Sequence, residues 1–134
     1  VKCYGENNIP HLLGAGAWCA SAIELCHFIS AIDGDPHYPD IISATSVDQM
    51  TKEGDYHFSL GWNTTPVKGV WSRTGTLSGT SALVLRYPDG ECWILVTNTS
   101  TWKGHGFSND TMRLFERLRQ ENRDKFPKRN LFFS

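Results

Sequence analysis

Residues 71–76 contain a cation, a hydroxyl group and a glycine in succession, and such a segment could bind an anion. The segment reads Trp-Ser-Arg-Thr-Gly-Thr, and Arg73 offers a forked guanidinium donor that suits a carboxylate. In a strand, Arg73 and Gly75 would point to one face and Thr74 to the other. Gly75 has no Cβ, so a ligand or another backbone can approach closely. The next backbone N–H, that of Thr76, could donate to an oxyanion, so the segment predicts an anion-binding strand edge.

Helices are expected in the first part of the chain, over about residues 1–54, after an irregular stretch at 1–14. Ser21 and Glu24 form a capping box before an apolar stripe with helical spacing. The stripe consists of Leu25, Phe28, Ile29 and Ile32, and Gly34 ends the helix. A second, shorter helix is predicted at 46–53, with a capping box of Ser46 and Gln49 and with Gly54 as its C-cap.

From about residue 55 to 134 the pattern predicts a sheet and then a C-terminal helix. Strands are expected at 56–62, 68–76, 81–87 and 91–98, and the turn Pro88-Asp89-Gly90 joins the last two, which are buried on both faces. The order of helices, a three- to four-stranded antiparallel sheet and a final helix is typical of an α+β fold.

The C-terminal helix is predicted over about residues 109–125, with Ser108 or Asn109 as its cap. Its apolar stripe consists of Leu114, Phe115 and Leu118. Its solvated face consists of Arg113, Glu116, Arg117, Arg119, Gln120 and Glu121.

The composition is that of one folded domain of 134 residues. With 40% hydrophobic residues, the chain is neither disordered nor of low complexity. Thirteen Lys and Arg against fourteen Asp and Glu give a net charge of −1, which does not favour nucleic acid as a partner. No apolar run is long enough to span a membrane.

Neither the cysteines nor the five histidines have the spacing of a metal site, so no metal and no cofactor is predicted. The cysteines are Cys3, Cys19, Cys26 and Cys92. We interpret them as buried free thiols, with one disulfide, involving Cys3, as the alternative. Three sequons, at Asn63, Asn98 and Asn109, would accept glycans in a secretory route. They favour a secreted protein without fixing the compartment.

Several short segments in a fixed order also carry a family resemblance. These are Gly14-Ala15-Gly16-Ala17-Trp18-Cys19-Ala20-Ser21, Ile32-Asp33-Gly34, Tyr56-His57-Phe58-Ser59-Leu60-Gly61-Trp62, Arg73-Thr74-Gly75-Thr76-Leu77-Ser78-Gly79-Thr80 and the Asp89-Gly90 turn. With them the chain resembles the C-terminal half of the serine β-lactamase and penicillin-binding protein superfamily. It looks closest to the class C-like serine hydrolases and esterases.

The resemblance implies roles for residues 73–76. Arg73-Thr74-Gly75 matches the family's third motif, usually Lys-Thr-Gly or His-Thr-Gly. Its cation and hydroxyl would contact the substrate carboxylate, and the Thr76 N–H would complete the oxyanion hole. Arg73 departs from the pattern, and a guanidinium does not readily give up a proton, so a proton-shuttling role is not implied.

The nucleophile motifs of the family, Ser-x-x-Lys and then Tyr-x-Asn or Ser-x-Asn, lie upstream of the third motif. The only Ser-x-x-Lys here, Ser100 to Lys103, follows that motif and precedes Gly104 and Gly106, so we interpret it as a chance match. No catalytic residue is assigned. Since the chain starts at Val1, residues 1–134 are expected to form one partial domain that an upstream N-terminal segment completes.

Two functions follow from these observations. The first is the C-terminal portion of a hydrolase that cleaves an ester or amide through an acyl-enzyme, with the isolated chain inactive. The alternative is a non-catalytic binding or interaction protein that reuses part of this fold. If the chain stands alone, its uncovered sheet edge predicts a homodimer or a partner strand.

Overall fold

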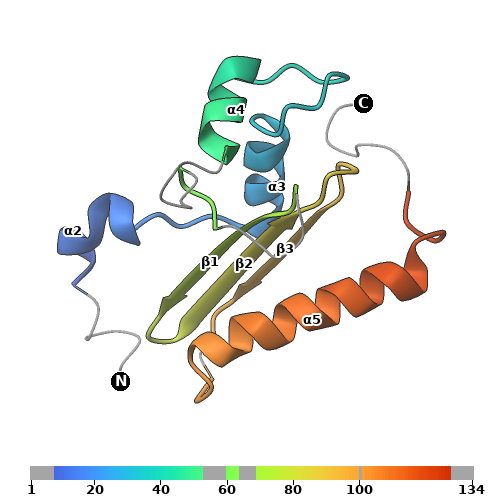
Figure 1. Cartoon of the computed structure of the whole chain (residues 1–134). Helices are drawn as coiled ribbons and strands as arrows, with labels where there is room; N and C mark the ends of the chain where they lie inside the picture. Colours follow the sequence, from blue (N-terminus) through green and yellow to red (C-terminus); the bar gives the residue numbers. More distant parts are fainter. Residues whose placement is uncertain (1–7, 53–59, 64–68, 100, 128–134) are drawn as a thin grey trace.

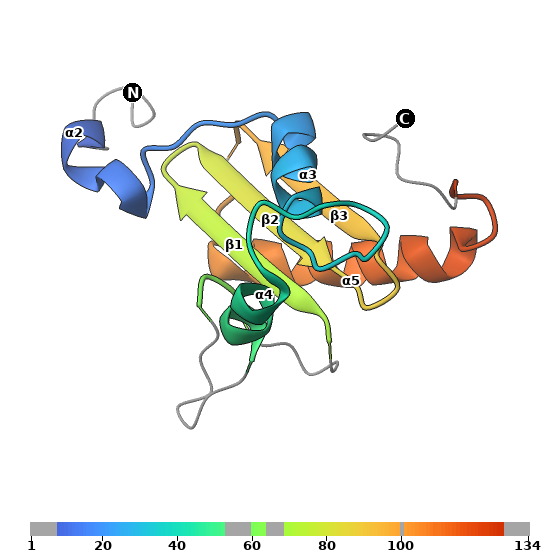
Figure 2. The same cartoon turned by 90° about the horizontal axis from the view of Figure 1, so that it is seen from above.

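The protein is an α+β fold in which helices cover both faces of a three-stranded antiparallel sheet (Figure 1). The computed structural model describes residues 8–52, 60–63, 69–99 and 101–127. Helices α3 and α4 lie on one face of the sheet and α5 lies across the other (Figures 1 and 2). The predicted fold class, with helices first and a helix last, is confirmed.

The sheet is a meander of β1 (Trp71–Leu77), β2 (Thr80–Arg86) and β3 (Cys92–Thr97), in the order β1-β2-β3. All three were predicted, with boundaries shifted by one to three residues. In the turn between β2 and β3, Gly90 has φ +89° and its N–H donates to the Tyr87 carbonyl at 3.0 Å. The prediction of this turn is therefore confirmed.

The strand predicted at 56–62 falls partly outside the described residues, which resume at Leu60. Over 60–62 the prediction is wrong, because Gly61 has φ +81°, which takes the chain out of an extended conformation. A single antiparallel bridge follows, in which the Asn63 N–H donates to the Ser72 carbonyl at 2.7 Å.

Helix α3 (Ala22–Ser30) begins where the sequence predicted. The Ser21 hydroxyl accepts from the Glu24 N–H at 3.2 Å, and the Glu24 carboxylate accepts from the Ser21 N–H at 2.7 Å. The helix ends at its C-cap Ala31, before Gly34. One member of its predicted apolar stripe, Phe28, is half exposed, whereas Ile29 is buried.

Helix α4 (Ala44–Thr51) starts two residues before the predicted range. Ser43 caps it, since the Ser43 hydroxyl accepts from the Ser46 N–H at 3.1 Å. Ser46 therefore lies inside the first turn, and the predicted Ser46–Gln49 capping box is wrong. The C-cap is Lys52, and Gly54 lies outside the described residues.

Two short helices precede α3 in a stretch that we expected to be irregular. Helix α2 spans Ile9–Leu12 and the 3-10 helix η1 spans Leu13–Ala15. Pro10 lies in the first turn of α2, where the missing proline N–H costs no hydrogen bond.

Helix α5 (His105–Asn122) begins four residues earlier than predicted, with Gly104 rather than Ser108 or Asn109 as its N-cap. Ser108 and Thr111 are instead buried, and the Thr111 hydroxyl donates to the Phe107 carbonyl at 2.9 Å. The predicted stripe is also rotated. Met112 and Phe115 pack on the sheet, whereas Leu114 is 44% exposed.

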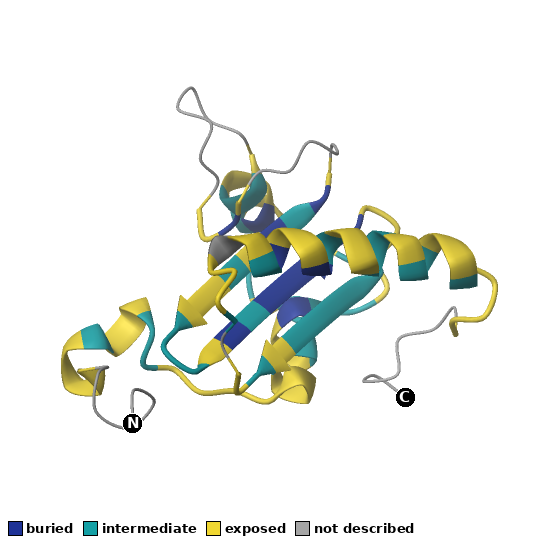
Figure 3. Cartoon of the chain, turned by 90° about the horizontal axis from the view of Figure 1, so that it is seen from below, coloured by how far each residue is buried: buried dark blue, intermediate teal, exposed yellow. Residues whose placement is uncertain are grey.

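The core consists of two layers separated by β2, which is buried along most of its length (Figure 3). On the α3 side the buried residues are Ile29, Ile32, Trp62 and Val84. On the α5 side they are Val70, Leu83, Leu85 and Tyr87. Strand β3 is only half buried, so the prediction of burial on both faces is confirmed for β2 alone.

Candidate functional site

The candidate anion-binding segment lies on β1, at one edge of the sheet (Figure 2). The Ser72 carbonyl faces away from β2, because it accepts from Asn63. Backbone direction alternates along a strand, so the N–H and C=O groups of Thr74 and Thr76 face away from β2 too. Within the described residues these outward groups have no backbone partner.

The side chains of β1 alternate as predicted. Arg73 pairs with Val84, which belongs to the α3-side core, and Gly75 pairs with Ala82 on the same face. Thr74 pairs with Leu83, which faces α5. Arg73 is exposed and Thr74 half buried, so the two side chains can approach one carboxylate only around the strand edge.

Gly75 is not required by the packing of the sheet. A Cβ added there would lie 3.9 Å from the Ala82 Cβ, an ordinary van der Waals contact, and the φ of Gly75 is not positive. The glycine therefore leaves open space at the edge that the fold itself would allow a side chain to fill.

The small-residue segment that precedes α3 passes the far end of β1. A Cβ added to Gly16 would lie 3.6 Å from the Leu77 Cδ1 atom. Trp18, two residues on, is 86% exposed. The structure thus brings two of the segments that carry the family resemblance close together, 14–21 and 73–80.

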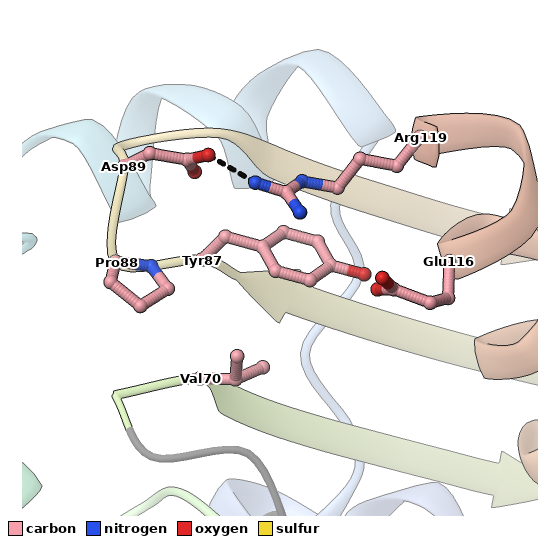
Figure 4. Close-up of a pocket in the computed structure, with 6 residues that line it drawn as sticks. All are labelled: Val70, Tyr87, Pro88, Asp89, Glu116 and Arg119. Carbon is pink, nitrogen blue, oxygen red and sulfur yellow. Dashed lines mark hydrogen bonds and ion pairs between the residues drawn. The ribbon is translucent and has the colours of Figure 1, made fainter. Parts of the chain in front are cut away.

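A second polar group of residues joins the turn after β2 to α5 (Figure 4). Arg119 pairs with Asp89 and donates from Nε to the Glu91 carboxylate at 2.7 Å. Its guanidinium carbon also lies 4.2 Å from the centre of the Tyr87 ring. We call Tyr87, Asp89, Glu91 and Arg119 the turn–helix clasp.

An open pocket of about 280 Å³ lies beside the clasp, lined by Val70, Tyr87, Pro88, Asp89, Glu116 and Arg119. Burial, together with a hydrogen bond to Glu116, raises the pKa of Tyr87 to about 12. The hydroxyl therefore stays protonated at neutral pH and donates to the Glu116 carboxylate. The polar groups that line this pocket pair with one another. These pairs hold α5 against the turn between β2 and β3.

The clasp was missed by sequence reasoning, which placed Arg119 on the solvated face of the helix. That placement is wrong, since the Arg119 side chain is only 14% exposed. Its partner Asp89 lies 30 residues away in sequence, and no local spacing rule connects residues so far apart. The sequence signal is Arg119 one helical turn after the apolar Phe115, together with Asp89 inside the Pro88-Asp89-Gly90 turn and Glu91 directly after it.

A third polar contact is buried on the α3 side. Arg86 donates to the Asp33 carbonyl at 3.1 Å, and its guanidinium lies 4.9 Å from the centre of a Trp71 ring. Burial raises the pKa of the Asp33 carboxyl above its ordinary value, although a hydrogen bond from the Asp35 N–H and the charge of Arg86 oppose the shift. The contact ties the loop after α3 to Arg86, the last residue of β2, and through the Trp71 ring to the start of β1.

Cys19, Cys26 and Cys92 are free thiols, as interpreted from the sequence, and Cys3 lies outside the described residues. Cys26 and Cys92 are half buried, whereas Cys19 is exposed, so burial was wrong for Cys19. Burial raises the pKa of Cys92 to about 12 and also raises that of Cys26. Both thiols are therefore poor nucleophiles.

The chance Ser-x-x-Lys match does not place Lys103 on a helix. Lys103 lies in the turn before α5, with its ammonium 2.5 Å from the Asp110 carboxylate, and Ser100 lies outside the described residues. The three sequon asparagines, Asn63, Asn98 and Asn109, are all exposed.

In the described part of the chain, no cluster of three or more His, Cys, Asp or Glu side chains is suited to a metal ion. No helix there has the length and apolar character of a membrane span. No protein-family model, no curated protein and no solved structure matches the chain.

Proposed function

We propose that this chain is the C-terminal portion of a serine hydrolase of the β-lactamase and penicillin-binding protein type. In the intact protein an ester or amide would be cleaved through an acyl-enzyme. This portion would supply the strand that binds the substrate, and an upstream N-terminal segment would supply the nucleophile. The isolated 134 residues would be inactive.

The observation that carries the proposal is the outer edge of β1 at Thr74 and Thr76, which has no backbone partner among the described residues. The Thr76 N–H faces outward there, as a donor to an oxyanion must. Gly75, which the sheet does not need, keeps the approach clear. The order of a helical part, β1-β2-β3 and α5 also agrees with the resemblance.

Each residue of the edge has a role in this proposal. The Arg73 guanidinium would pair with a carboxylate of the substrate, and the Thr74 hydroxyl would donate to the same group. The Thr76 N–H would stabilise the negative charge that develops on the carbonyl oxygen during acyl transfer. Arg73 would stay charged throughout, so proton transfer would fall to residues outside this chain.

Binding to the edge can be tested without turnover. We expect benzylpenicillin, a carboxylate that needs no reaction to bind, to shift the NMR amide signals of Thr74, Gly75 and Thr76. Arg73→Gln should weaken this binding at least tenfold, because the charged fork is lost. Arg113→Gln, which removes an exposed cation on α5, is the matched control and should leave the binding unchanged.

Shifts confined to other residues, or equal effects of the two variants, would contradict the proposal. Inactivity is tested separately with nitrocefin and a p-nitrophenyl ester. Turnover by the pure chain that disappears in Ser100→Ala would show that the Ser100 match is functional after all.

The alternative is a non-catalytic binding protein that uses the same edge. The observation that favours it is Arg73 itself, since a guanidinium holds an anion but does not relay protons. Intact mass of the protein from its native source would separate the two functions. An upstream sequence with Ser-x-x-Lys and Tyr-x-Asn would favour the hydrolase.

A further inference from the structure

Two free thiols lie in the same layer of the molecule, between α3 and the sheet. On α3, Cys26 is half buried and lies one helical turn before Ile29, which is 2% exposed and belongs to the α3-side core. Residues three apart share a face of a helix, so Cys26 points toward the sheet. His27 and Phe28, which lie between the two on the sequence, are exposed on the other side of the helix.

Cys92 reaches the same layer from β3. It pairs with Arg86 on β2, and Ile94 pairs with Val84, a buried residue of the α3-side core. Side chains two residues apart share a face of a strand, so Cys92 and Ile94 both point toward α3. Both of them pack on the core cluster that contains Ile29.

Among the described residues, α3 approaches the sheet most closely at β3. Cα atoms of the two elements come within 8 Å of each other, and a disulfide needs a Cα–Cα distance of about 4.4–6.8 Å. Burial is the main cause that raises the pKa of Cys92 to about 12, and repulsion from a Cys26 thiolate adds to it. Repulsion between like charges shifts a pKa only at short range, which agrees with the placement of both thiols in one layer.

We propose that Cys26 and Cys92 form a reversible disulfide that joins α3 to β3 when the protein meets a small-molecule disulfide such as oxidised glutathione. The Cys26 thiolate attacks one sulfur of the oxidant, whose S–S bond breaks, and one reduced thiol leaves with the proton that Cys26 released. The Cys92 thiolate then attacks the Cys26 sulfur, and the second reduced thiol leaves with the proton of Cys92. One small-molecule disulfide is thereby reduced to two thiols while the two cysteines are oxidised.

Cys26 reacts first because Cys92 ionises with more difficulty. A pKa of about 12 leaves Cys92 almost no thiolate at neutral pH, whereas the pKa of Cys26 is raised by burial alone. Once Cys26 carries the small thiol, it no longer bears the negative charge that opposes ionisation of Cys92. The second attack is also intramolecular, which favours it over a second molecule of oxidant. Since both thiols are poor nucleophiles, we expect closure over minutes to hours.

Oxidised glutathione added to the folded chain tests the proposal, with intact mass and peptide mapping under non-reducing conditions as readouts. Cys3→Ser with Cys19→Ser removes the other two cysteines and serves as the background. We expect the mass to fall by two hydrogen atoms and a linked Cys26–Cys92 peptide to appear, and dithiothreitol should reverse both changes. The melting temperature should rise by about 10 °C on oxidation, because the bond closes a long loop that contains α4, β1 and β2.

Two single variants in the same background test the order of the steps, with circular dichroism as the check on the fold. Cys92→Ala should stop with one glutathione on Cys26, and Cys26→Ala should react at least tenfold more slowly. Glutathione on both cysteines, two thiols that stay free, or a linked peptide that forms only in urea would overturn the proposal. These outcomes leave the proposed hydrolase function untouched, because β3 is at the edge of the sheet opposite β1.

Discussion

Arg119 and Arg73 carry the same guanidinium group in opposite settings. Arg119 is held by Asp89, by Glu91 and by the face of Tyr87, and its side chain is nearly buried. Arg73 is exposed on a strand whose outer edge, within the described residues, has Asn63 at Ser72 as its one backbone partner. The turn–helix clasp thus uses its charges to hold the fold together, whereas the β1 edge leaves its charge available for a ligand.

If the α5 side of the sheet contributes most to stability, substitutions in the core between the sheet and α5 should lower the free energy of unfolding the most. Leu83 is 1% exposed, so Leu83→Ala should lower the free energy of unfolding by about 3 kcal/mol through lost burial and a cavity. Leu114→Ala makes the same chemical change at a residue that is 44% exposed, and should cost far less. Urea denaturation measures both. Equal losses would place Leu114 in the core, as the sequence suggested.

The clasp itself should give the next largest effect. Arg119→Ala removes the guanidinium that Asp89 and Glu91 share. The two carboxylates keep weaker contacts, such as Arg123 at 3.9 Å and the Trp93 Nε1 donor at 3.3 Å, so we expect a loss of about 2 kcal/mol in thermal or urea unfolding. Arg117→Ala removes a guanidinium that is 69% exposed and, among the described residues, paired with Glu121 alone, and it should cost under about 0.5 kcal/mol. Similar losses in both variants would mean that the clasp contributes no more than a surface ion pair.

A smaller effect separates the two candidate caps of α4. Ser43→Ala should cost about 1 kcal/mol, because the Ser46 N–H loses its acceptor. Ser46→Ala keeps that hydrogen bond and removes only the contact between the two hydroxyls at 2.9 Å. The comparison is made by urea denaturation at one pH. A larger loss for Ser46→Ala would restore the helix start that the sequence predicted.

The smallest effect concerns Asp33, which links the helical part to β2 through Arg86. Burial raises the pKa of Asp33 above its ordinary value of 3.8, so the folded protein binds this proton more tightly than the unfolded chain does. Its contribution to stability is therefore full below pH 3.8 and is lost as the pH rises through the folded pKa. Asp33→Asn should remove this dependence, measured as unfolding free energy from pH 3 to 7. An unchanged pH profile would contradict the shift.

The sequence was sufficient to predict what depends on short-range patterns. The three strands, the Pro88-Asp89-Gly90 turn and the Ser21 cap follow from alternation, turn chemistry and a four-residue motif. The facing of Arg73, Thr74 and Gly75 on β1 follows from the two-residue period of a strand. That Asn63 alone of the described residues pairs with the outer edge of β1 does not follow from any such pattern, because it is a tertiary contact.

The start of α5 shows why other features were missed. Ser108 and Asn109 are good caps by type, yet tertiary packing extends the helix back to His105 and buries Ser108 and Thr111 against the sheet. The same rotation of the helix carries Leu114 outward and Arg119 inward. Local propensity contains no information about such a rotation, since the position of the sheet decides it.

The meander order of the strands bears on how the chain folds. Each strand pairs with its neighbour in sequence, and α5 follows β3 directly, so no long loop must close before the sheet and its covering helix assemble. The loop-closure entropy of this part is therefore small. We expect the β1-β2-β3 meander and α5 to form the folding nucleus, with the helices α3 and α4 joining late, so that changes in α3 and α4 alter unfolding rates rather than folding rates.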